Sequence, residues 1–209
     1  PSKESVIGIL GPNGMGKSTA INILSGQLIP NLGDYDAEDV WLEDAIESLP
    51  KGELRDFLNL VLEGDISISL KPQYVDHLPR VASGPVRDLL SKVDETGTLD
   101  ENAEKLGISH LLERNIDQLS GGELQRVAIC ATLLKDAEVY FFDEPSSYLD
   151  IHERMRMVKI IQDLAKTKRV IVIEHDLAVL DVLADLVHIV YGEKGAFGIF
   201  TPARPTRTA

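Results

Sequence analysis

The chain has 209 residues, of which 44% are hydrophobic, and is long enough for one substantial domain with room for a smaller lobe. Its formal net charge of -13 argues against binding nucleic acid through the whole surface and leaves only a local basic patch open. The single cysteine, Cys130, excludes an internal disulfide and a cysteine cluster for metal ligation, so we expect a reducing cytoplasm and a buried thiol. No apolar run reaches the roughly 18 to 20 residues of a membrane span, which predicts a protein without membrane contact.

A glycine-rich loop follows the first predicted strand, SVIGIL from Ser5. Within it, GPNGMGKS has the spacing G-x-x-x-x-G-K-[ST] between that strand and a helix that starts near Lys17. Glycines free the backbone to wrap its N–H groups around a polyphosphate at the positive end of the helix dipole. Lys17 would neutralise the β and γ phosphates of ATP, and the Ser18 hydroxyl would bind Mg²⁺. The predicted phosphate-binding residues are Gly11, Pro12, Asn13, Gly14, Met15, Gly16, Lys17, Ser18 and Thr19.

A helical insertion is predicted next, at about residues 36–65. An amphipathic helix after Gly52 is indicated by apolar residues at i, i+3, i+4, i+7 and i+8, which are Leu54, Phe57, Leu58, Val61 and Leu62. Gln73 follows a short strand-like segment, ISISLK. Its amide could reach the Mg²⁺ or the attacking water, although a glutamine outside such a context is usually a surface residue.

A helical lobe is predicted at about residues 77–135. Successive short helices run from Pro85, which we expect at the first helical position, to Lys135, with Gly97 and Gly107 as breaks.

The lobe contains a second glycine turn before a helix, LSGGELQ. Ser120, Gly121 and Gly122 stand at the start of a helix that runs toward Leu134. Hydroxyl, backbone N–H and helix dipole would together form a second anion cradle, complementary to a γ-phosphate.

The second half of the chain predicts an α/β core. Strands VYFF from Val139, VIVI from Val170 and VHIVY from Val187 alternate with helices at 151–166 and 177–184. This order implies right-handed crossovers and a mostly parallel sheet buried on both faces.

Two of these strands end in residues that can act on a phosphate. Asp143 and Glu144 follow one strand, at the carboxyl edge where open α/β sheets bind ligands. Asp143 would hold Mg²⁺, and Glu144 would deprotonate the attacking water. Taken alone, such a pair is more often a solvated strand end, and the glycine loop reverses that interpretation. His175 ends the next strand and could hydrogen-bond the γ-phosphate, whereas a lone histidine is usually structural. The other histidines show no metal-ligand spacing: His77, His110, His152 and His188.

The motifs stand in the order P-loop, Gln73, LSGGELQ, FFDEP, SSYLD, His175, and this order resembles the nucleotide-binding domain of ABC-type ATPases over essentially the whole chain. The resemblance implies the P-loop NTPase fold of that family, and it makes SSYLD the D-loop. In that family two domains associate head to tail, and the signature motif of one closes over the P-loop ATP of the other. The signature residues to which it assigns nucleotide binding are Ser120, Gly121, Gly122 and Glu123.

Longer segments are similar to the E subfamily, the twin-ATPase ribosome recycling factors of archaea and eukaryotes, and to the first nucleotide-binding domain in particular. They are KPQYVDHLPRVASGPVRDLL, LKDAEVYFFDEPSSYLDIHERM, IVIEHDLAVLD and YGEKGAFGIF, together with PNLGDYD, Glu123 in place of a glutamine, and Tyr148. This resemblance implies a cytoplasmic, Mg²⁺-dependent ATPase that splits ribosomes into subunits after termination. Its implied partners are a second nucleotide-binding domain, the small ribosomal subunit and a release factor.

The sequence starts at Pro1 without a methionine and stops shortly after a strand-like run, so we expect a piece of a longer protein. The subfamily's iron–sulfur clusters are then expected only in a domain absent from this chain. We place the nucleotide-binding domain at residues 1–200 and the start of a hinge at residues 201–209, TPARPTRTA, which has no apolar period.

Two other functions share part of these motifs. The ATPase subunit of a membrane transporter has every catalytic motif, and only the segments around Gln73 and SSYLD speak against it. A regulatory module that binds nucleotide without hydrolysing it would have no use for Glu144 and His175.

Overall fold

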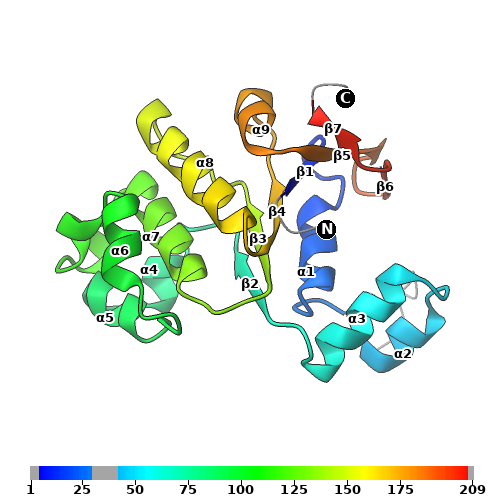
Figure 1. Ribbon diagram of the computed structural model, residues 1–209, viewed down its shortest axis with the longest axis horizontal. Coiled ribbons are helices and arrows are strands. Elements are labelled where there is room, and N and C mark those ends of the chain that lie inside the picture. Colours follow the sequence, from blue (N-terminus) through cyan, green and yellow to red (C-terminus); the bar gives the residue numbers. More distant parts are fainter. Residues whose placement is uncertain (1–4, 30–41, 207–209) are drawn as a thin grey trace.

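The computed structural model describes residues 5–29 and 42–206 and contains one seven-stranded sheet, in the order β2-β3-β4-β1-β5-β6, with β7 also paired to β5 (Figure 1). Strands β1 to β5 pair with one another in parallel, and β6 and β7 run antiparallel to β5. The mostly parallel α/β sheet predicted from the sequence is therefore confirmed. The strands are β1 (Val6–Leu10), β2 (Ile68–Lys71), β3 (Val139–Asp143), β4 (Arg169–Ile173), β5 (Leu186–Glu193), β6 (Phe197–Phe200) and β7 (Arg204–Pro205).

Helices cover both faces of the sheet. On β3, Tyr140 and Phe142 face the large core formed with α7, α8 and α9, while Val139 and Phe141 face a smaller core that includes Ile21 of α1. A strand buried on both faces needs an uninterrupted apolar run, which is why VYFF has no polar alternation. The helices are α1 (Lys17–Leu24), α2 (Leu42–Ser48), α3 (Glu53–Glu63), α4 (Leu78–Val81), α5 (Val86–Ser91), α6 (Leu99–Lys105), α7 (Gly121–Leu133), α8 (Ile151–Ala165) and α9 (Leu177–Leu183), with short 3₁₀ turns η1 (Ser109–Leu111) and η2 (Ile116–Gln118).

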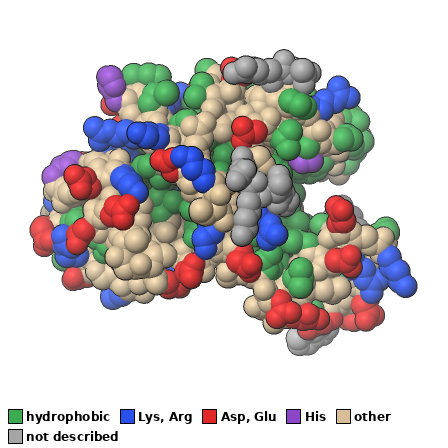
Figure 2. Space-filling model, in the orientation of Figure 1, with side chains coloured by type: hydrophobic (Ala, Val, Ile, Leu, Met, Phe, Trp, Pro, Cys, Tyr) green, Lys and Arg blue, Asp and Glu red, His purple; other side chains and the backbone are tan. Residues whose placement is uncertain are grey.

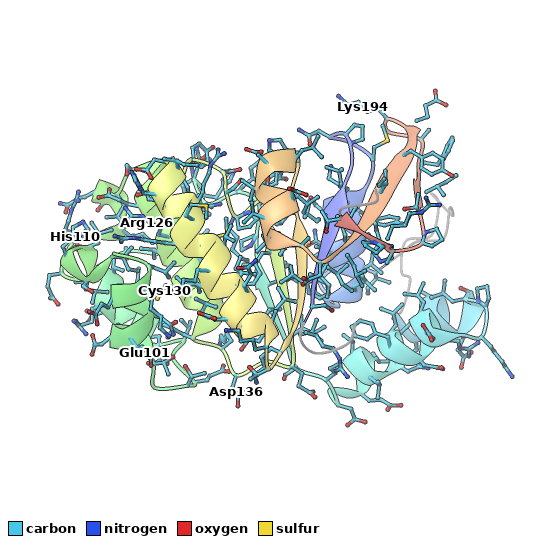
Figure 3. The ribbon with its side chains drawn as sticks, turned by 45° about the horizontal axis from the view of Figure 1, so that its top comes forward. Glu101, His110, Arg126, Cys130, Asp136 and Lys194 are labelled. Atoms are coloured by element: carbon cyan, nitrogen blue, oxygen red, sulfur yellow. The ribbon has the colours of Figure 1, made fainter. Side chains whose placement is uncertain are left out.

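The two predicted helical regions lie at different ends of the sheet. The lobe α4–α7 packs beside β2, where the Ser69 hydroxyl donates a hydrogen bond of 2.9 Å to the carbonyl oxygen of Thr132. Cys130 is fully buried within the lobe, as expected, and burial raises the pKa of its thiol to about 12 (Figure 3). The insertion α2–α3 lies below α1 in Figure 1, and residues 36–41 of the predicted insertion are outside the described ranges.

The surface reflects the acidic composition. Figure 2 shows acidic side chains gathered over the α2–α3 insertion, at the lower right. Over the described part of the chain, no helix combines the length and the apolar character that crossing a membrane requires.

One local expectation differs from the structure, and one segment holds an element that its composition did not indicate. Pro85 is the N-cap of α5 and not its first helical residue, because its ψ of 141° is extended. The expected hinge at residues 201–209 includes β7, in which Pro205 and Arg204 pair with Leu186 and Val187. Such pairing is made by main-chain groups, so the polar composition of this segment does not reveal it.

Candidate functional site

The predicted phosphate loop connects β1 to α1. Gly14 and Gly16 have φ of 83° and 80°, which L side chains rarely adopt. A Cβ atom on Gly11 would lie 2.6 Å from the carbonyl oxygen of Val190, so only glycine fits there. The loop is thus shaped by three glycines, which leaves its backbone N–H groups free to turn toward a ligand.

The hairpin between β5 and β6 supports this loop from outside. Gly195 donates a backbone hydrogen bond of 3.2 Å to the carbonyl oxygen of Gly14. Lys194 lies in the turn of this hairpin (Figure 3), and its side chain is 2.8 Å from the position that a Cβ atom on Gly14 would take. The last part of the described sheet therefore holds the first loop of the chain in place.

Lys17 is 5% exposed and lies inside the loop. Its Nζ donates to the carbonyl oxygens of Gly11 at 2.7 Å and of Pro12 at 2.9 Å. Burial lowers the pKa of this ammonium, against the carboxylates of Glu144 and Asp143, which raise it. The positive charge is therefore fixed between the loop and the end of β3, as the predicted role in phosphate neutralisation requires.

Asp143, the last residue of β3, fits a magnesium ion. Burial and the nearby Glu144 raise the pKa of the Asp143 carboxyl group, while a hydrogen bond from Ser18 and the charges of Lys71 and Lys17 lower it, and the net change is upward. Its buried Oδ1 has no hydrogen-bond partner among the described residues. A buried carboxylate oxygen without a donor, beside a serine hydroxyl, is the donor chemistry that Mg²⁺ takes.

Glu144 follows β3 and meets the residues that end the two neighbouring strands. Its Oε1 accepts a hydrogen bond of 2.9 Å from Nε2 of Gln73 and lies 3.7 Å from Nδ1 of His175. The structure thus brings together the three residues predicted to act on the attacking water and the γ-phosphate, from the ends of β2, β3 and β4. Gln73 reaches Glu144 through its amide nitrogen, and its predicted contact to the metal stays a prediction.

Three polar residues at this edge were not predicted from the sequence. Lys71 and Gln125 donate from their side chains to the main-chain carbonyl oxygen of Glu144, at 3.5 and 2.7 Å. Glu174 accepts hydrogen bonds from the backbone N–H groups of His175 and Ser146, at 3.0 and 3.4 Å, and so ties the end of β4 to the D-loop. All three are fully buried. The alternation of ISISLK places Ser69 and Lys71 on one face of β2, but it gives no signal that this polar face is the buried one.

The predicted second anion cradle is a capping box. Oε2 of Glu123 accepts from the backbone N–H of Ser120 at 2.8 Å and from its hydroxyl at 2.9 Å. The backbone hydrogen bond from Ser120 lowers the pKa of the Glu123 carboxyl group, and its hydroxyl and the nearby Arg114 act in the same direction. The two donors of Ser120 that were expected for a phosphate are therefore held by an internal carboxylate, and nucleotide binding by Ser120, Gly121, Gly122 and Glu123 stays a prediction.

The D-loop packs on the signature glycines. The ring of Tyr148 is 3.3 Å from the position that a Cβ atom on Gly121 would take, and its carbonyl oxygen is 2.9 Å from that of Gly122. Its hydroxyl donates a hydrogen bond of 2.9 Å to Oδ2 of Asp76, three residues after Gln73.

The signature helix α7 and the P-loop helix α1 lie on opposite sides of β3 and β4 in Figure 1. One chain thus places its two glycine turns apart and not on one shared ligand.

A family model described as ABC transporter matches residues 2–147, which is more than half of the chain. The chain belongs to this family of ABC ATPases. Its domain fold is therefore that of the P-loop NTPases, and the domains of this family hydrolyse ATP.

Individual relatives of this ABC ATPase domain are similar over its whole length. An uncharacterized ABC transporter ATP-binding protein of Methanocaldococcus jannaschii is 48% identical over 205 residues, which are 98% of this chain and 34% of that protein. The archaeal ribosome recycling factor aABCE1, in its crystal structure with the archaeal ribosomal stalk protein aP1, is 49% identical with a TM-score of 0.92, over 100% of this chain and 40% of that one. A model of ribosome-bound archaeal Pelota and ABCE1 gives 50% identity and a TM-score of 0.86, over 99% of this chain and 35% of that one. The chain spans about a third of the length of the curated relatives it matches.

Proposed function

We propose that this chain is one of two nucleotide-binding domains in a cytoplasmic ATPase that splits ribosomes into subunits after termination. The observation that carries the proposal is the similarity along the entire chain to an archaeal ribosome recycling factor, at 49% identity. In this proposal the domain covers residues 1–200, residues 201–209 begin a hinge, and any iron–sulfur clusters belong to a domain outside this chain. The small ribosomal subunit and a release factor are its proposed partners.

For hydrolysis, the proposed roles follow from the geometry of the sheet edge. Lys17 and residues 11–19, through the backbone N–H groups that all of them except Pro12 carry, hold the phosphates of ATP. Ser18 and Asp143 would hold Mg²⁺, with Gln73 as a further ligand. The metal would supply positive charge to the β and γ phosphates. Glu144 accepts a proton from the attacking water, and His175 donates a hydrogen bond to the γ-phosphate. The contact of 2.9 Å between Gln73 and Glu144 supports this assignment, because it orients the carboxylate that must meet the water.

The second domain completes the site in this proposal. Ser120 and the glycines after it lie at the start of α7, a helix of 13 residues, whose N-terminal end carries partial positive charge. They would close over the ATP of the other domain and replace the Glu123 carboxylate by the γ-phosphate as the acceptor for Ser120. Closure on two ATP molecules is the step that drives the subunits apart, and hydrolysis reopens the pair.

The test is fractionation of a lysate that contains the full-length protein, with a non-hydrolysable ATP analogue or without nucleotide. We expect the protein to sediment with small ribosomal subunits when the analogue is present, and purified protein with ATP and a release factor to convert ribosomes into subunits on a gradient. Sedimentation with membranes, with no shift toward subunits, would support a transporter subunit and contradict the proposal.

A further inference from the structure

Lys71 is a fully buried lysine that the roles above leave without a task. It is the last residue of β2, an edge strand, and its Nζ donates to the carbonyl oxygens of Asp143 at 2.9 Å and of Glu144 at 3.5 Å. Burial lowers the pKa of its ammonium to about 8, although the carboxylates of Asp143, Glu144 and Glu174 raise it. Burying a charged amine costs free energy that an apolar side chain would not cost, so its contacts are the feature to explain.

The contacts of Lys71 converge with those of Gln125 on one peptide segment. Gln125 is also fully buried, and its Nε2 donates to the carbonyl oxygen of Glu144 at 2.7 Å. The lysine comes from β2 and the glutamine from α7, so two elements far apart in the sequence hold the same atom. Glu144 itself has φ of 47°, in the left-handed region that non-glycine residues adopt only where the surroundings impose it.

Holding these two carbonyl groups fixes the direction of the Glu144 side chain. Each peptide group is planar, so the carbonyl oxygen of Asp143 marks the plane before the Cα atom of Glu144 and its own carbonyl oxygen marks the plane after it. Fixing both planes fixes φ and ψ at Glu144, and therefore the direction of its Cα–Cβ bond. That bond leads to the Oε1 atom that meets Gln73 at 2.9 Å.

We propose that Lys71 is a positioning residue for ATP hydrolysis. Together with Gln125 it fixes the main chain at Asp143 and Glu144, and this orients the Glu144 carboxylate toward the attacking water. The inference rests on the proposed role of Glu144 as the base. It also gives the signature helix a link to the base of its own chain, because Gln125 lies in the second turn of α7, shortly after the signature glycines.

The first experiment replaces Lys71 by methionine in the full-length protein. A base displaced by about 1 Å can cost on the order of 10²-fold in rate, so we expect kcat to fall by about 10-fold or more while the KM for ATP and the affinity for ATP change little. The matched control is Ser69→Ala, which removes another buried hydrogen bond from the same face of β2 to a main-chain carbonyl group, that of Thr132. This control should lower the melting temperature and leave kcat unchanged.

A double variant separates positioning from general damage. If Lys71 acts only through Glu144, adding Lys71→Met to Glu144→Gln should not slow turnover further, because residues that act as a unit are not additive. A further fall of the same size as in the single variant would overturn the inference.

Gln125→Met gives an independent arm, because it removes the other donor to the Glu144 carbonyl group. We expect the same selective fall in kcat. If kcat is unchanged in both Lys71→Met and Gln125→Met while Glu144→Gln hydrolyses ATP slowly, this inference is overturned. The proposed role of Glu144 as the base is then unaffected. If Lys71→Met and Gln125→Met both fail to fold while Ser69→Ala folds, the two residues contribute to stability alone. This outcome also overturns the inference. Unchanged turnover in Glu144→Gln contradicts the proposed function itself.

Discussion

The charged residues at the two glycine turns of this chain differ in burial and in their partners. At the P-loop edge, Lys17, Asp143 and Glu144 are buried, and the two carboxylates favour the charged form of Lys17. At the signature turn, Glu123 is held by Ser120 and by Arg114, at the surface of the helical lobe. The charged groups of the P-loop edge interact with one another inside the domain. The signature turn is a capped helix end at the surface, and its donors are accessible to another molecule.

The difference shows which half of an active site each turn supplies. Buried groups that face each other keep their geometry, and such preorganisation is what stabilises charge in a transition state. A surface cap can exchange its internal carboxylate for an external phosphate at small cost, since both are anions that bind the same N–H groups. The predictions below separate the two turns by what each variant changes.

The largest expected effect is at the P-loop edge. Glu144→Gln should slow ATP turnover by roughly 10² to 10⁴-fold and leave ATP affinity intact, because it removes a proton acceptor and no phosphate contact. Phosphate release and equilibrium nucleotide binding measure the two quantities in the full-length protein. Glu138→Gln, just before the other end of β3, is the matched control and should hydrolyse ATP at the rate of the unaltered protein.

Lys17→Ala should weaken binding of ATP itself, by roughly 10 to 100-fold, because it removes a charge-assisted contact to the phosphates. Filter binding measures this affinity. Lys194→Ala removes a second lysine beside the same loop, from the exposed hairpin turn, and should have little effect. Unaltered ATP affinity in Lys17→Ala would contradict the phosphate role of the loop.

Ser120→Arg tests the signature turn. We expect it to abolish closure over the ATP of the other domain and to leave the affinity of its own P-loop unchanged, because the two turns lie apart in this chain. Site-resolved nucleotide trapping in the full-length protein separates the two sites, and Ser109→Arg, another exposed serine of the lobe, is the control. Equal loss at both sites would argue against a composite site.

The smallest expected effect is on stability, at the same turn. Glu123→Gln should lower the free energy of unfolding near pH 7 by about 1 kcal/mol or less, because the charged half of the capping box is removed. Hydrogen bonds from Ser120 lower the pKa of Glu123 in the folded state below its usual 4.5. Its contribution is therefore present above that pH and is lost as the pH falls through the lower folded value. Urea unfolding at a series of pH values should show the two proteins converging in acid, and a constant difference would refute the cap.

The sequence predicted the elements that depend on local pattern. The apolar runs of β1, β3, β4 and β5, and the spacing of the P-loop, follow from periodicity and glycine geometry within short windows. The pairing of Gln73, Glu144 and His175 also followed, because parallel strands bring their carboxyl ends to one edge. The capping box could have been predicted as well, since Ser120 and Glu123 have the spacing S-x-x-E.

What could not be predicted depends on contacts between distant elements. Lys71 resembles any polar strand end until the end of β3 and helix α7 bury it. Gln125 lies inside a motif whose known roles belong to the residues before it. β7 is paired through main-chain groups, which have no side-chain signature. Burial of a polar residue is decided by tertiary packing, so local windows carry no information on it.

The position of β1 has a consequence for how the chain is made. This strand precedes the other described strands, yet it pairs with β4 and β5, and the N–H of Val6 is bound to the carboxylate of Asp185, 179 positions later. The hairpin that braces the phosphate loop comes later still. Since contacts between distant residues form slowly and only after both partners have left the ribosome, the nucleotide site is among the last parts of this domain to assemble during translation.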